Sequence, residues 1–257
     1  MQMKANILSV ILMLGVIACW ADAAEVIYEP FDYAAGAFDG SQAGGTGMSG
    51  GWTTVTAGNG PYGTIAGGLA VTGLTVAGNT CGRSTYVGDN EMHRAISAAS
   101  QTALLGDGLT VWFSVLFKNR KYSTGNEHQS LVIGTDAFTS WSTAPPGMAG
   151  GEGFGVGYNT QYAIKAVVIN GGVSSYGSGS LTTVDGPTYL IAGKITWAAN
   201  GNSDTLHLFN ISDPDAPEPS EVDAFATATV DLDQSLFDTL AVASKQYSYL
   251  DEIRFAT

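Results

Sequence analysis

Acidic side chains stand near both ends of the chain, in runs that could pair as strands. Glu29 and Asp32 come early in the sequence, and Asp251 lies near its end. A β-sandwich that pairs its first and last strands would bring these carboxylates together, where they repel unless a cation or Arg254 neutralises them. Calcium prefers hard oxygen ligands of this kind. The sequence predicts a structural calcium site at Glu29, Asp32 and Asp251, with pairing to Arg254 as the alternative.

Aromatic and basic side chains define a second candidate site, suited to sugars. A sugar site combines an aromatic face that stacks on a pyranose with polar groups that fix its hydroxyls. Trp112 lies on the non-core face of a predicted strand, and Trp141 lies in a polar, proline-containing loop. Arg120, Lys121 and His128 follow Trp112 closely in sequence. We predict that these five residues bind a ligand, with packing as the alternative for both tryptophans.

Other chemistry finds little support in the residue pattern. The three histidines, His93, His128 and His207, are far apart in sequence and lack the local spacing of a zinc site. Cys81 is the one cysteine outside the N-terminal segment, so no intramolecular disulfide is predicted there. No catalytic constellation is evident, and the sequence favours a non-enzymatic protein.

Alternating hydrophobicity predicts the strands that must position these residues. From Leu109 to Lys118 every second residue is a large apolar one, which places a core face on one side and a half-buried face bearing Trp112 on the other. Gly153–Tyr158 alternates glycine with large apolar residues, so its glycine face could admit another chain or a ligand. Tyr189–Trp197 and Asp204–Ile211 flank an Asn-Gly turn and predict a hairpin.

Further strands are predicted at 163–170, 240–244 and 249–255. Residues 213–219 carry three prolines and predict an exposed acidic loop. Helix is expected only within 91–105 and 232–237. Such a series of short strands predicts an all-β fold: a two-sheet antiparallel β-sandwich, formed by residues 24–257 as a single domain.

Several phrases of the sequence resemble a known group of proteins. They are Tyr28–Gly36, the glycine-rich run from Gly44 to Trp52, Val111–Ser114, Gly193–Thr196 and Leu250–Arg254. Together they resemble secreted bacterial proteins with a laminin-G-like, concanavalin A-like jelly roll. Many members carry a sorting anchor of the PEP-CTERM kind after the closing strand, whereas this chain ends at Thr257 without one.

The resemblance implies a concanavalin A-like jelly roll used for carbohydrate or matrix binding, and in distant branches for polysaccharide cleavage. Related sandwiches often hold calcium where the terminal strands meet, which again implicates Glu29, Asp32 and Asp251. The Glu-x-Asp-x-x-Glu run of the glucanase branch and the Gln-x-His of alginate-lyase-like proteins are absent from the sequence. Two alternatives to glycan binding stay open: an adhesive or structural surface protein, and a polysaccharide-cleaving enzyme.

The N-terminus and the overall charge indicate where the protein works. Lys4, an apolar stretch from Ile7 to Trp20 and the small residues up to Ala23 predict a signal peptide over residues 1–23, hence secretion. A lipoprotein acylated at Cys19 is the alternative. The net charge of −13 argues against nucleic acid and anionic membranes as partners. No transmembrane segment is predicted, because the apolar stretch is too short.

Overall fold

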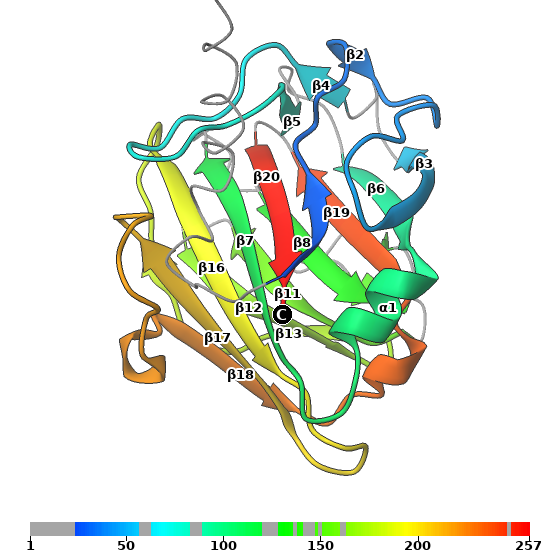
Figure 1. Cartoon of the computed structure of the whole chain (residues 1–257), viewed down its shortest axis with the longest axis vertical. Helices are drawn as coiled ribbons and strands as arrows, with labels where there is room; N and C mark the ends of the chain where they lie inside the picture. Colours follow the sequence, from blue (N-terminus) through cyan, green and yellow to red (C-terminus); the bar gives the residue numbers. More distant parts are fainter. Residues whose placement is uncertain are drawn as a thin grey trace, which may run out of the picture.

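Strands with alternating apolar residues pair into two antiparallel sheets that lie face to face (Figure 1). The predicted fold class, an all-β two-sheet antiparallel sandwich, is therefore confirmed. The computed structural model describes residues 24–56, 63–82, 89–119, 128–135, 138–140, 147–148, 151–159, 163–245 and 248–257. The predicted signal peptide, the alternative acylation site at Cys19, and Arg120, Lys121 and Trp141 lie outside this described part of the chain.

The larger sheet has ten strands among the described residues. In spatial order they are β14 (Ser178–Gly179), β18 (Ala226–Val230), β17 (Asp204–Ile211), β16 (Thr188–Thr196), β7 (Thr110–Asn119), β20 (Ser248–Ala256), β5 (Thr80–Gly82), β4 (Gly63–Ile65) and β2 (Gly36–Ala37), with β1 (Glu25–Glu29) also paired to β20.

The smaller sheet has eight strands in the same part of the chain. They run β13 (Val173–Tyr176), β12 (Ala163–Asn170), β11 (Gly153–Asn159), β8 (His128–Gly134), β19 (Thr239–Lys245), β6 (Asp89–Ile96) and β3 (Met48–Thr56), with β15 (Leu181–Thr182) paired to β12. A separate pair joins β9 (Phe138–Ser140) to β10 (Gly147–Met148).

The chain passes repeatedly from one sheet to the other, as β6, β7 and β8 do in succession. Helical structure is brief: α1 (Ala98–Leu104) and two 3-10 turns, η2 (Glu221–Asp223) and η3 (Gln234–Leu236). Ser97 caps α1 by accepting the Ser100 N–H. α1 and η3 lie within the two ranges where short helices are expected, 91–105 and 232–237, although β6 occupies the first part of 91–105. Among the described residues, no helix is long and apolar enough to cross a membrane.

One hydrophobic cluster fills the space between the sheets. Phe113 and Phe117 enter it from β7, as the alternation predicts, and Phe154 enters it from β11. Phe154 stacks on Trp197 with their ring centroids 6.0 Å apart, so aromatic contacts bridge the two sheets.

The opposite face of the larger sheet, which we call its outer face, is more buried than the sequence suggests. Trp112 and Leu116 are 7% and 0% exposed, although half-burial was expected. The loop 66–79 covers Leu116, and the segment that follows β17 covers Trp112 and Phe209. Covering loops thus form a third layer, which strand periodicity does not encode.

The glycine face of β11 is explained by packing against neighbouring strands. A Cβ at Gly153 would lie 2.7 Å from the Val132 side chain, and one at Gly157 would lie 2.6 Å from that of Val167. Because valines of β8 and β12 occupy this space, the glycines are needed by the sheet itself.

Candidate functional site

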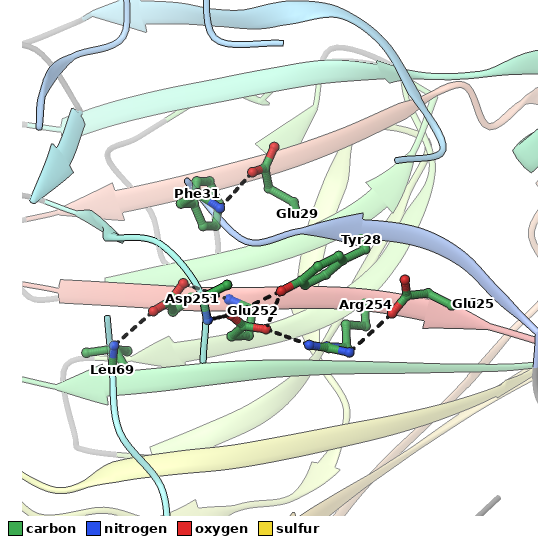
Figure 2. A network of polar contacts seen from close by, with 9 residues as sticks. Glu25, Tyr28, Glu29, Phe31, Leu69, Asp251, Glu252 and Arg254 are labelled. Atoms are coloured by element: carbon green, nitrogen blue, oxygen red, sulfur yellow. Dashed lines mark hydrogen bonds and ion pairs between the residues drawn. The ribbon is translucent and has the colours of Figure 1, made fainter. Parts of the chain in front are cut away.

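The first and last strands of the chain lie side by side, as the acidic runs at the two ends predicted. β1 pairs with β20, with Tyr28 opposite Arg254 and Glu29 opposite Ile253. Just beyond these strands, the Ala24 N–H donates to the Thr257 carbonyl at 2.9 Å. We call this region the terminal junction; Figure 2 shows its polar contacts.

Glu29 is fully buried, and protein donors surround its carboxylate. One oxygen accepts the Phe31 N–H at 2.8 Å. The other accepts the Tyr33 hydroxyl at 2.7 Å and the Trp52 indole N–H at 2.8 Å, and pairs with Arg94 at 3.1 Å. Burial raises the pKa of Glu29 above its ordinary value, against the opposing effect of these hydrogen bonds and of Arg94.

Asp251 is buried at a bulge of β20. It lies opposite Leu116 of β7, and the register of the two strands shifts between Asp251 and Arg254. Its Oδ2 accepts the Leu69 N–H at 2.8 Å, and its Oδ1 accepts the Glu252 N–H at 2.9 Å. Burial raises the pKa of Asp251 to about 8, even though these two N–H groups favour the charged form. The carboxyl therefore holds the loop 66–79 against the bulge.

The calcium site predicted from Glu29, Asp32 and Asp251 does not fit this geometry. The buried carboxylates of Glu29 and Asp251 already accept a hydrogen bond at each oxygen, and Asp32 is exposed. In the described residues, no group of three His, Cys, Asp or Glu side chains is placed to hold a metal ion. Glu29 is instead paired with Arg94, and Asp251 accepts two backbone N–H groups.

Arg254 belongs to the second charged cluster of the junction, as Figure 2 shows. Its guanidinium donates to Glu252 at 2.7 Å and to Glu25 at 3.2 Å, and lies 4.2 Å from the ring centroid of Tyr28. Glu252 also accepts the Ala77 N–H at 2.7 Å, so it holds the loop 66–79 at a second point. It adopts φ 52°, a left-handed conformation that is uncommon for a residue with a side chain.

A hollow of about 170 Å³ opens on the outer face of the larger sheet, next to this cluster. Strands β7, β16, β17 and β20 form its floor, and the segment 212–219 forms a wall. The register explains part of the floor: Ser114 lies between Ala192 of β16 and Arg254 of β20, so two small side chains lie next to each other beside the arginine. Hereafter we call it the outer hollow.

The outer hollow combines apolar surface with a few polar groups. Trp112 packs on Phe209 with their ring centroids 5.7 Å apart, and prolines 214, 217 and 219 make the wall. Asn210, Ser212 and Asp213 add exposed polar groups at the rim. Proline restricts the wall conformationally, so little freedom is lost when a ligand binds.

The structure places only part of the predicted ligand set. Trp112 belongs to the floor of the outer hollow, with 7% of its surface exposed. His128 begins β8 on the smaller sheet, and its side chain is outside the described part, as are Arg120, Lys121 and Trp141 altogether. Ligand binding by those four residues stays a prediction.

Sequence reasoning missed Arg94 and the hollow itself. Arg94 is 3% exposed and lies on the core side of β6, where periodicity marks it only as a charged residue between Met92 and Ile96. That charged residue was the available signal, because a buried arginine requires an acidic partner. The hollow had no comparable signal, since its floor comes from four strands spread between residues 110 and 256.

Comparisons with known proteins give distant structural likenesses. No protein-family model and no curated protein matches the chain. Among solved structures, a carbohydrate esterase of the Shiga toxin-encoding bacteriophage phi24B matches with 13% identity and a TM-score of 0.47, over 91% of this chain and 99% of that one. The exoplasmic/lumenal domain of VIP36 bound to Ca²⁺ and Man3GlcNAc matches with 10% identity and a TM-score of 0.45, over 80% and 81%.

A legume lectin-like domain from Entamoeba histolytica matches with 7% identity and a TM-score of 0.42, over 79% of this chain and 87% of that one. All three TM-scores are below 0.5, so the fold assignment rests on the strand pairing of this chain itself.

Proposed function

We propose that the protein is a secreted, non-catalytic glycan-binding β-sandwich that takes one sugar unit into the outer hollow. The observation that carries the proposal is the composition of this hollow: a floor that includes Trp112 and a proline-rich wall, beside exposed hydroxyl and amide groups. Carbohydrate recognition needs this combination of apolar contact and directed hydrogen bonds.

The size of the outer hollow supports a small ligand. Its volume of about 170 Å³ is below the ~300–1,000 Å³ range of pockets for drug-sized molecules. One ring of a larger polysaccharide matches such a space better than a whole oligosaccharide. The rest of the glycan would then lie along the outer surface.

The number of carboxyl groups in the outer hollow argues against glycoside hydrolysis there. Glycoside hydrolases use two carboxyl groups on either side of the scissile bond. Asp213 is the single carboxylate among the described residues that line the outer hollow. Binding without cleavage is the activity that this residue set supports.

A test of the proposal removes one polar group from the rim. Asn210 is exposed at the end of β17, and Asn210→Ala should weaken glycan binding about two- to tenfold, the loss expected for one net hydrogen bond. Asn202→Ala is the matched control and should leave the affinity unchanged, because Asn202 lies in the turn that precedes β17, at the opposite end of the strand from Asn210. The affinities would be measured by calorimetry on a glycan first identified with an array.

Equal affinities for the wild type and Asn210→Ala would show that the glycan does not bind in the outer hollow. The second candidate, an adhesive or structural protein without a small ligand, would then be preferred. This second candidate is supported by the burial of Trp112, which already packs on Phe209 and leaves little aromatic surface for a sugar.

A further inference from the structure

The charges around the outer hollow are not balanced, and this restricts which sugars can enter. Arg254 is the basic residue that lines the hollow among the described residues. Its guanidinium is already paired with Glu25 and Glu252 and lies against the Tyr28 ring, as Figure 2 shows. A further anion at Arg254 would have to approach two carboxylates that neutralise it.

The next basic group on this face is also engaged. Lys194 lies with its Nζ 5.8 Å from the centroid of the Trp112 ring and pairs with Glu221 at 2.9 Å. Neither cation is therefore available to an acidic ligand without breaking an existing ion pair.

The wall of the outer hollow adds negative charge. Asp213 lines the hollow and is exposed, with its Oδ1 accepting the Asp215 N–H at 3.0 Å. Asp215 and Glu218 lie on the same segment and are exposed as well. The polar groups left to contact a ligand, Ser114, Asn210 and Ser212, are uncharged.

From this arrangement we propose that the outer hollow selects uncharged sugars and rejects acidic ones, with Asp213 as the residue that enforces the choice. The inference rests on the proposed function and names its ligand class: neutral hexose or pentose units rather than uronates or sulfated sugars. Hydroxyls can donate to the Asp213 carboxylate, whereas a second carboxylate or a sulfate is repelled by it.

The experiment compares neutral polysaccharides (mannan, xylan, a β-glucan) with acidic ones (alginate, polygalacturonate, a carrageenan) by affinity electrophoresis and calorimetry. Measurements at about 10 mM and about 150 mM salt exploit screening, because the Debye length falls from ~30 Å to ~8 Å between them. The wild type should bind at least one neutral polymer with little salt dependence, and should bind the acidic polymers least at low salt.

The decisive variant is Asp213→Asn, which should raise binding of an acidic polymer about fivefold at low salt by removing one close like charge. Glu218→Gln is the matched control: it removes the same charge from the same segment, but Glu218 does not line the hollow. Its effect should be less than about twofold, because the repulsion weakens as the distance between the charge and the bound anion grows.

Three outcomes overturn the inference, and they separate it from the proposed function. Tighter binding of acidic than neutral polymers, weakened by Asn210→Ala, would keep glycan binding at the hollow but refute the selectivity. Equal gains in affinity for an acidic polymer in Asp213→Asn and Glu218→Gln would show that the overall negative charge of the protein, not Asp213, excludes acidic sugars. Binding of no polymer, or binding that Asn210→Ala does not change, would refute the proposed function and the inference together.

Discussion

At the terminal junction, Arg94 and Arg254 pair with three glutamates, whereas Asp251 accepts two backbone N–H groups. The sequence indicated that Glu29 and Asp251 would come near each other and that Arg254 was an alternative to calcium. Arg254 does neutralise acids here, but they are Glu252 and Glu25, while Glu29 is paired with Arg94. The partner of a buried charge depends on side-chain directions across strands, which local sequence does not specify.

Removing the Glu29 carboxylate should be costly. Glu29→Gln leaves the buried Arg94 guanidinium without its ion-pair partner, and breaking a buried pair in this way costs about 3–5 kcal/mol of unfolding free energy. Glu221→Gln breaks the exposed pair with Lys194 and should cost less than about 1 kcal/mol. Urea unfolding of both variants measures the difference; comparable small losses would show that the Glu29–Arg94 pair contributes little.

The titration of Asp251 should appear in the pH dependence of stability. Its pKa is about 8 in the folded protein against an ordinary value of 3.8, so between these pH values the folded state holds more protons than the unfolded state. The unfolding free energy should therefore fall as pH rises through this window. Asp251→Asn should flatten this part of the profile, whereas Asp223→Asn, at an exposed site, should not. Parallel profiles for Asp251→Asn and the wild type from pH 5 to 9 would contradict the assignment.

At the scale of elements, alternation located most of the long strands and the two faces of β7. The predicted segments 109–118 and 163–170 correspond to β7 (Thr110–Asn119) and β12 (Ala163–Asn170), and the Asn-Gly hairpin corresponds to β16 and β17. The helix expected within 91–105 is α1 (Ala98–Leu104), whereas the first part of that range belongs to strand β6, which lies between β19 and β3. The covering loops, and with them the outer hollow, could not be predicted, since loop packing follows no period.

The covering layer predicts a distinct role for Trp112. Trp112→Ala would open a cavity against Phe209 and Ala192, and losses for such truncations are about 3–5 kcal/mol. Trp141→Ala, in the loop singled out by the sequence, should instead weaken glycan binding by about 1 kcal/mol with little change in melting temperature. Thermal unfolding and binding titrations of the two variants give the comparison. A wild-type melting temperature for Trp112→Ala would contradict the packing described here.

For the whole molecule, the fold closes on itself through β1 and β20, so a chain that begins at Ala24 keeps every described strand. If residues 1–23 act as the predicted signal peptide, the chain is cleaved after Ala23 on export. N-terminal sequencing of protein recovered from a secreting host should read Ala24-Glu25-Val26. A mature chain beginning at an acylated Cys19 would establish the lipoprotein alternative instead.

The central claim is that the outer hollow is where a neutral glycan binds, and mapping of backbone amide shifts by NMR tests it most directly. Titration with a neutral oligosaccharide should shift amides of β7 and β16 around Ser114 and Ala192 and those of residues 210–216, all at the outer hollow. Amides on the smaller sheet, such as those of β11 and β19, should stay in place. Shifts confined to the smaller sheet, with none around the outer hollow, would contradict the account.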